Sequence, residues 1–331
     1  MYNSKIIGLG HYVPDNVVSN HDLSKVMDTS DEWIQERTGI KERRHVIPDQ
    51  DTTTSMGVKA ARIAIERAGI EKDDIDFIVF ATLSPDYYFP GCGVQVQEML
   101  DIKTCPALDV RNQCSGFIYG LSVADQFIKT GMYKNVLLIG SENHSGGLDM
   151  TTRGRSVSVI FGDGAGAAVL TRSDHNGQGI LSTHLHSEGK HALELSLKGP
   201  STMHWVPEII EENPQEDIPY YPYMNGQYVF KNAVQRFSEV IMEGLQENGL
   251  EVSDIDMLIP HQANLRISQF IQQKFKLNDD QVFNNIQKYG NTTAASIPIA
   301  LTEAWEQGKI KEGDHVVLAA FGSGFTWASA V

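Results

Sequence analysis

One cysteine lies in a setting that suits a nucleophile. Cys114 is part of NQCSGFIYG (residues 112–120), between a polar Asn-Gln pair and a small Ser-Gly pair. We expect a strand to end at Val110, and residues 115–131 carry apolar side chains at helical spacing. At the start of a helix, the dipole and free backbone N–H groups lower a thiol pKa from about 8.5 to about 3.5–7.5. The pattern therefore predicts a reactive thiolate, although a lone buried cysteine is more often structural.

A histidine and two asparagines are candidates to act with this cysteine. His261, in LIPHQANLRI, follows an apolar run expected to be a buried strand, and Asn264 can reach the same pocket. Asn291, in KYGNTTAASIPIAL, precedes a helix opening of small residues where Thr292 and Thr293 are possible caps. Alone, His261 reads as a core histidine and Asn291 as a cap. Together with a thiolate they favour acyl transfer, in which His and Asn hydrogen-bond around the reacting carbonyl.

Three other motifs carry weaker signals. FGDGAGAAVL (161–170) contains GxGxG but no helix start with a later acid, so it fits a tight turn better than a dinucleotide site. His184 and His186 share one face of an expected strand near Glu188, but without a third ligand at firm spacing we predict no metal site. AFGSGFTW (320–327) is a glycine-rich strand end whose backbone can approach a ligand closely, or a simple bend.

An internal repeat shows how these residues are positioned. At an offset of 180 residues, GIEKDDIDFIVF from Gly69 matches GLEVSDIDMLIP from Gly249, and VLLIG from Val136 matches VVLAA from Val316. Each copy reads as a helix, a glycine stop and a buried strand. We therefore expect an α/β fold of two similar halves with helices between parallel-rich sheets, residues 1–175 carrying the cysteine and 176–331 carrying His and Asn. The site is expected where the halves meet.

The composition excludes several classes of protein. Three cysteines without CxxC spacing argue against a disulfide framework and a structural zinc site. The net charge of −15 makes nonspecific nucleic-acid binding improbable, and an acidic partner would need a local basic patch. No segment approaches the roughly 18 apolar residues of a membrane span, and no secretory signal is expected. We expect a cytoplasmic enzyme that binds neither nucleic acid nor membrane.

Five motifs in one order resemble β-ketoacyl-[acyl carrier protein] synthase III, of the thiolase superfamily. They are DEWIQERTGI, FGDGAGA, PHQANLRI, GNTTAASIP and FGSGFTW, and the resemblance runs from Lys5 to the C-terminus. It implies a thiolase fold, an acylated nucleophile at Cys114, and His261 and Asn291 around the malonyl thioester carbonyl. The implied reaction takes an acyl group from acyl-CoA onto Cys114. Malonyl-acyl carrier protein then loses CO₂, and its enolate attacks the acyl-enzyme to give a 3-oxoacyl product in fatty acid biosynthesis.

The same resemblance implies roles for residues outside the catalytic set. Backbone N–H groups of Cys114 and of the loop with Ser323 and Gly324 would hold the oxyanion. No cofactor is implied, since acyl-CoA is a substrate. Phe89 matches a residue that reaches the partner subunit's acyl tunnel, so a homodimer is implied. The CoA entrance would contain Trp33, Arg37, Arg155 and Asn264, and the patch for the acidic carrier protein would contain Lys231, Arg266 and Lys274.

Some departures from the family bear on substrate choice. Asn112 and Gln113 precede the cysteine where small residues are usual, Ser323 replaces a glycine, and Gly154 precedes Arg155 where a DRGT run is expected. Residues 190–230 are longer than the standard connection and rich in aromatics and prolines. We hypothesise that this segment changes acyl-chain or acceptor preference.

Three alternatives remain at this stage. One is a synthase-III-like ketosynthase or acyltransferase that uses longer or unusual acyl groups in secondary metabolism. Another is a papain-type cysteine peptidase. Its catalytic Cys, His and Asn also follow one another in this order along the chain, but its C-G-S-C-W signature is absent here. The third is a non-catalytic acyl-CoA-binding or scaffold subunit.

Overall fold

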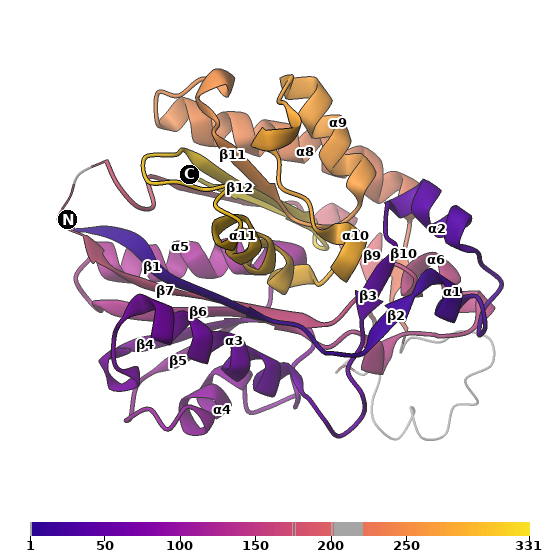
Figure 1. Cartoon of the computed structure of the whole chain (residues 1–331), viewed down its shortest axis with the longest axis horizontal. Helices are drawn as coiled ribbons and strands as arrows, with labels where there is room; N and C mark the ends of the chain where they lie inside the picture. The colour runs from indigo at the N-terminus through magenta and orange to yellow at the C-terminus, as the bar shows by residue number, and fades with distance from the viewer. Residues whose placement is uncertain (1, 174, 176, 200, 202–220) are drawn as a thin grey trace.

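Two sheets form the framework of the chain, and the computed structural model describes residues 2–173, 175, 177–199, 201 and 221–331 (Figure 1). The first sheet has the order β1-β7-β6-β4-β5 and the second β11-β12-β13-β8. Their strands are β1 (Asn3–Tyr12), β4 (Phe77–Ala81), β5 (Ala107–Val110), β6 (Asn135–Glu142), β7 (Gly164–Ser173), β8 (Thr183–Ser187), β11 (Met257–Pro260), β12 (Val316–Gly322) and β13 (Thr326–Ala330).

The two sheets repeat one pattern. In the first, β1 and β6 are each antiparallel to β7, and β4 is parallel to β6. In the second, β8 and β12 are each antiparallel to β13, and β11 is parallel to β12. The predicted duplication of an α/β unit is therefore present, with mixed sheets, because the strands without a helix crossover run antiparallel. The predicted boundary near residue 175 falls between β7 and β8.

Helices fill three layers around the sheets. Figure 1 shows α5 and α11 between the sheets, α3 and α4 against the first, and α8 and α9 against the second. Separate apolar clusters occupy the central and the two outer layers, so each sheet is buried on both faces. The bounds are α3 (Thr53–Ala68), α4 (Cys92–Met99), α5 (Gly116–Lys129), α8 (Gly226–Glu247), α9 (Leu265–Phe275) and α11 (Ser296–Glu306).

Helix α3 illustrates how the sequence sets an element and its packing. Thr52 caps its N-terminus by accepting from Ser55 N, and Gly69 ends it in the left-handed conformation, with φ +66°. The helix lies directly on β1, because a Cβ at Gly8 would lie 2.1 Å from Ala64 O. A side chain at that glycine would push the helix off the sheet.

Short elements gather at one end of the molecule, beside the start of α2 (Asp31–Thr38) (Figure 1). Of the predicted 190–230 segment, residues 200 and 202–220 lie outside the described residues; its start forms β9, which pairs with β10. Within the described chain, no helix is long and apolar enough to cross a membrane. The remaining short elements are β2 (Val17–Ser19), α1 (Asn20–Leu23), β3 (Glu42–Arg44), α6 (Arg155–Ser158), β9 (Leu195–Ser196), β10 (Tyr223–Met224) and α10 (Ile286–Tyr289).

Candidate active site

Cys114 lies in a tight turn between β5 and α5, as the sequence predicts. The 3₁₀ turn Gln113–Ser115 leads directly into α5, and the cysteine side chain is 7% exposed. Gln113 has a φ of +45°, a conformation that costs about 1–3 kcal/mol for a residue with a side chain. The surrounding packing holds this strained turn, which places the sulfur at the mouth of the helix.

The end of β12 passes close to this sulfur. A Cβ at Gly322 would lie 2.7 Å from Cys114 Cβ and 3.2 Å from its Sγ, so only glycine fits there. Two backbone hydrogen-bond donors are directed at the sulfur, the N–H of Cys114 and the N–H of Ser323, and the Thr293 hydroxyl is a third hydrogen-bond partner of the sulfur. Two backbone donors at one point are what an oxyanion hole requires.

The predicted low pKa of the cysteine is wrong for this structure. Burial raises the pKa of the Cys114 thiol to about 12, and the charge of Glu142 raises it further. The hydrogen bonds to the sulfur favour the thiolate but do not offset the loss of hydration. Cys114 is therefore a neutral thiol in the free protein, and any nucleophilic attack by its sulfur would require loss of the thiol proton.

His261 follows β11 and is fixed by its neighbours. Its backbone N–H donates to Ala319 O at 2.8 Å, and its Nδ1 lies 2.6 Å from Ser296 Oγ. Ser296 Oγ accepts a hydrogen bond from the Gln262 N–H, so the serine hydroxyl proton is free to be donated to His261 Nδ1. Because Nδ1 then acts as the acceptor, we assign the proton of the imidazole ring to Nε2. Burial lowers the pKa of His261 to about 3, with a smaller contribution from His144, so the ring is neutral.

The Nε2 atom of His261 is a donor without a partner. It is buried and makes no hydrogen bond to any residue that the structure describes. A buried polar group in this state costs free energy, which a hydrogen bond to a ligand would recover. Nε2 is thus placed to donate to a substrate oxygen.

Asn291 is held by its own loop. Its backbone bonds to Ile160 O and to Gly162 N, and its Oδ1 accepts from Thr293 N at 2.8 Å. The amide oxygen is therefore engaged, and the Nδ2 group remains as a donor. The predicted capping role of Thr292 and Thr293 is wrong: neither side chain caps a helix, and Thr293 Oγ1 lies 2.8 Å from His144 Nε2.

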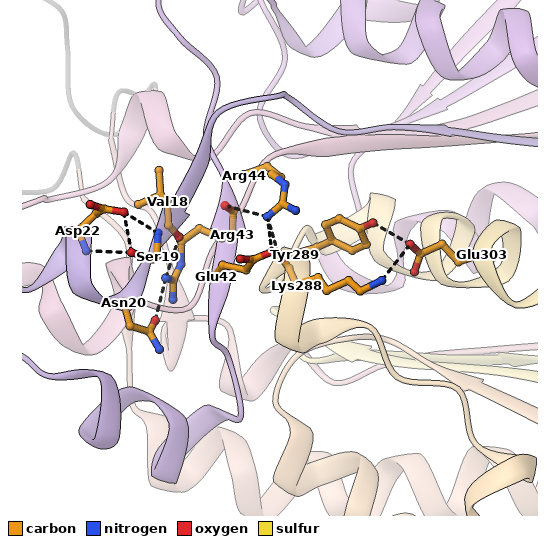
Figure 2. Close-up of polar contacts among 10 residues, drawn as sticks. All are labelled: Val18, Ser19, Asn20, Asp22, Glu42, Arg43, Arg44, Lys288, Tyr289 and Glu303. Carbon is orange, nitrogen blue, oxygen red and sulfur yellow. Dashed lines mark hydrogen bonds and ion pairs between the residues drawn. The ribbon is translucent and has the colours of Figure 1, made fainter. Parts of the chain in front are cut away.

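A polar network holds Lys288 and Tyr289, which precede the Asn291 loop in the chain (Figure 2). The Tyr289 hydroxyl donates to Glu303 Oε1 at 2.7 Å, and Arg44 Nη1 donates to Lys288 O at 3.0 Å. Gly290 has a φ of +64°, and a Cβ there would lie 2.7 Å from Ile160 O. These contacts fix the backbone immediately before Asn291.

The three predicted catalytic residues converge on one buried region. Cys114 and Asn291 are linked through Thr293, whose hydroxyl points at the sulfur and whose N–H bonds the amide. His261 is bonded to β12, whose last residue touches Cys114. Side chains of all three are at most 7% exposed. The arrangement can hold an acyl group on the sulfur with hydrogen-bond donors around it.

The predicted CoA-entrance residues lie together at the α2 end. The guanidinium carbons of Arg37 and Arg155 lie 4.4 and 5.2 Å from the centre of the Trp33 ring. Asn264 donates to Arg37 O at 2.9 Å and caps α9 through Arg266 N, so its amide joins two helices. A planar base has an aromatic ring and two cations to stack against here.

The predicted carrier-protein patch is an exposed basic surface on α8 and α9. The side chains of Lys231, Arg266 and Lys274 are exposed, and none has an acidic partner within 4 Å among the described residues. Arg266 lies 5.8 Å from the Phe230 ring. Phe89, the predicted tunnel residue, is 81% exposed beside Tyr87 and Tyr88.

The weaker motifs have structural explanations. His184 and His186 both contact Glu243, and no group of three or more metal-ligating side chains occurs in the described chain. Gly162 precedes β7, and a Cβ there would lie 2.2 Å from Tyr289 O. Gly164 and Gly166 lie at the start of β7, where a Cβ at Gly166 would lie 2.6 Å from Pro298 Cβ. These two glycines allow α11 to pack on the strand, so most of the predicted turn is strand.

Ser323 connects the oxyanion loop to the predicted 190–230 segment. Its hydroxyl donates to Leu195 O in β9 at 2.5 Å, while its N–H remains directed at Cys114. Gly154, which also departs from the family pattern, packs on Asp149: a Cβ at Gly154 would lie 2.1 Å from the Asp149 carbonyl oxygen. The serine therefore ties the start of that segment to the loop that contacts the nucleophile.

Two buried residues beside the site escaped sequence analysis. His144 follows β6 and bonds Thr293, and Glu142 accepts from Thr82, Leu83 and Ser84. Burial raises the pKa of Glu142 to about 7. The sequence signal was their position just past the VLLIG run of β6, as His261 lies just past β11 in the second sheet.

Comparison with known proteins shows the family to which the chain belongs. The families described as 3-Oxoacyl-[acyl-carrier-protein (ACP)] synthase III and its C-terminal domain match residues 108–189 and 245–331. The chain is similar to β-ketoacyl-[acyl-carrier-protein] synthases III of Aliivibrio fischeri and Escherichia coli, each 48% identical over 99% of this chain and 98% of the relative. The crystal structure of 3-oxoacyl-[acyl-carrier-protein] synthase III from Aquifex aeolicus superposes with a TM-score of 0.89 at 44% identity, covering 99% of this chain and 98% of that one. The peptidase interpretation is therefore wrong, and the chain belongs to the β-ketoacyl-[acyl-carrier-protein] synthase III family.

Proposed function

We propose that this enzyme condenses an acyl-CoA with malonyl-[acyl carrier protein] and releases CO₂, giving 3-oxoacyl-[acyl carrier protein] for fatty acid biosynthesis. The observation that carries the proposal is the buried Nε2 of neutral His261, which has no hydrogen-bond partner among the described residues. An acyltransfer site needs such a donor, whereas a scaffold subunit would gain nothing from it.

In the first half-reaction Cys114 Sγ attacks the acyl-CoA carbonyl carbon. The N–H groups of Cys114 and Ser323 stabilise the tetrahedral oxyanion, each donor contributing about 10²–10³ in rate. The bond from carbon to the CoA sulfur then breaks, CoA leaves as its thiol, and the acyl group remains on Cys114.

In the second half-reaction the malonyl thioester oxygen accepts from His261 Nε2 and Asn291 Nδ2. Loss of CO₂ leaves its electron pair as an enolate, and the two neutral donors stabilise the negative oxygen. The enolate carbon attacks the acyl carbonyl, the acyl–sulfur bond breaks, and the Cys114 thiolate that is released takes a proton from solvent. All groups used are side chains and backbone of this chain, so we propose no resident cofactor or metal.

The surfaces around the site suit the two substrates. We propose that Trp33, Arg37 and Arg155 bind the nucleotide part of CoA, because they combine a ring with two cations. The exposed cations Lys231, Arg266 and Lys274 would bind the acidic carrier protein. We also propose a homodimer, which would cover Tyr87, Tyr88 and Phe89, and a cytoplasmic location, where three free cysteines are ordinary.

The test is the intact mass of the protein after incubation with acyl-CoAs from acetyl to dodecanoyl. We expect a mass gain that maps to Cys114, is absent in Cys114→Ala, and turns into 3-oxoacyl product and CO₂ when malonyl-[acyl carrier protein] is added. The chain-length profile separates priming of fatty acid synthesis from a specialised pathway. An acyl-enzyme that never releases CO₂ would contradict the condensation and favour simple acyl transfer.

A further inference from the structure

A second buried histidine adjoins the nucleophile, and the mechanism above leaves it unused. His144 follows β6, is 8% exposed, and has Nε2 at 2.8 Å from Thr293 Oγ1. Its ring lies 4.7 Å from that of Phe161, and its backbone N–H donates to Asp163 Oδ1 at 2.7 Å. The imidazole is therefore held in one place with one ring nitrogen on the threonine.

Thr293 lies between this histidine and Cys114. Its hydroxyl contacts both Cys114 Sγ and His144 Nε2, and its backbone has a φ of +49°. A threonine in this conformation is strained, and its N–H bond to Asn291 helps to hold it there. A hydroxyl has one proton and two lone pairs, so it can accept a proton on one side while giving its own on the other.

The sulfur needs a group that takes its proton. The titratable groups around His144 are Asp163, His45, His261, Cys114 and Glu142. Asp163 accepts from backbone N–H groups of residues 46, 144 and 145, and Glu142 accepts from the 82–84 loop. His261 has Nδ1 occupied by Ser296. Of these groups, only His144 has a nitrogen in line with the sulfur through a hydroxyl.

We propose that Thr293 and His144 form a proton relay for the Cys114 thiol during acylation, a step that rests on the proposed function. As the Sγ–carbon bond forms, the thiol proton passes to Thr293 Oγ1 and the threonine proton passes to His144 Nε2. When the bond to the CoA sulfur breaks, that sulfur takes a proton and His144 returns to neutral by the same path. Thr293 touches the reacting atom, and His144 is a positioning residue that acts through it.

The electrostatics agree with a neutral acceptor. Burial lowers the pKa of His144 to about 4, and Asp163 opposes this shift. At neutral pH the imidazole of His144 is therefore uncharged, and one ring nitrogen is free to accept a proton. Because the resting thiol and imidazole are both neutral, the transfer takes place with bond formation and not before it.

Glutamine at position 144 separates the relay from packing. His144→Gln can still hydrogen-bond Thr293 but is not a base, and Thr293→Val removes the bridging hydroxyl, which Thr293→Ser restores. The matched control is His45→Gln, since His45 is also buried beside Asp163 but has no contact with Thr293 in the described structure. Acylation is measured as acyl-enzyme formed in rapid-quench mass spectra, and CO₂ release from malonyl-[acyl carrier protein] is measured separately.

We expect acylation by His144→Gln to fall about 10²-fold, the usual contribution of a positioned base, and to rise with pH more steeply than in the parent enzyme. CO₂ release should fall by much less, and Thr293→Ser should recover most of the acylation lost in Thr293→Val. Equal losses in both half-reactions, an unchanged pH profile, or the same loss in His45→Gln would overturn the relay.

Alkylation of Cys114 by iodoacetamide tests the relay without any acyl-CoA. The relay predicts slower alkylation at pH 7 in His144→Gln than in the parent enzyme and in His45→Gln. If the parent enzyme forms no acyl-enzyme, the proposed function fails, while this comparison still decides whether His144 takes the proton. Equal alkylation rates in the three proteins would refute it.

Discussion

Ser296→Ala should weaken decarboxylation while leaving the nucleophile in place. The serine hydroxyl lies 2.6 Å from His261 Nδ1 and holds the tautomer in which Nε2 carries the proton. Removing it leaves a buried nitrogen unsatisfied, which costs about 1–3 kcal/mol. It also allows the proton to move to Nδ1, and Nε2 would then face the malonyl carbonyl as an acceptor. We expect CO₂ release to fall about 10–100-fold.

The chain offers a matched control for this variant. Ser268 is also buried, and its hydroxyl has no hydrogen-bond partner among the described residues. Ser268→Ala removes the same oxygen from another helix without touching His261. The assay is CO₂ release from malonyl-[acyl carrier protein], run beside acylation by acyl-CoA. The reasoning is refuted if Ser296→Ala behaves like Ser268→Ala, or if it slows acylation as much as decarboxylation.

Three further changes test the surroundings of the site. Trp33→Ala should raise KM for acyl-CoA about 10-fold, since stacking on a base contributes about 1–3 kcal/mol, and steady-state rates with acyl-pantetheine, which lacks adenine, should not change. Arg266→Glu should raise KM for malonyl-[acyl carrier protein] and reduce its salt dependence, whereas the exposed Lys309→Glu, an equal charge change, should not. Burial raises the pKa of Glu142 to about 7, above its usual 4.5, so this group's contribution to stability is present below about pH 4.5 and is lost as pH rises through 7, about 3 kcal/mol in all. The free energy of unfolding from urea titrations should be lower at pH 8 than at pH 5 in the parent enzyme and should not show this loss in Glu142→Gln. The same change between the two pH values in both proteins would contradict the reasoning.

Sequence patterns predicted the positions of the catalytic residues better than their chemistry. Cys114 follows β5 of the first sheet and His261 follows β11 of the second, and sites in α/β folds lie at the carboxyl ends of strands, so their places could be inferred. The pKa of Cys114 could not, because it depends on how much protein covers the sulfur. That cover comes from β12 and Thr293, which are distant in sequence.

The sheets show a second limit. The helix–strand repeat predicted parallel neighbours, which holds for β4 and β6 and for β11 and β12. Strand β13 follows β12 after a short turn, and β7 follows β6 after a loop that contains only the four-residue helix α6 and short 3₁₀ turns; both strands run antiparallel to the strand before them. Local periodicity finds a strand but does not give its direction, which depends on the connection.

The duplication explains why the residues that sequence analysis missed lie where they do. The offset of 180 residues pairs Glu142 with Gly322 and His144 with Gly324, so the end of β6 and the end of β12 are equivalent positions. In the second half that position supplies a loop whose backbone contacts the sulfur. In the first half it supplies a carboxyl and an imidazole instead. Both strand ends face Cys114 because the halves meet there. A polar residue just past a strand in one half is therefore a candidate site residue whenever the equivalent position in the other half already belongs to the site.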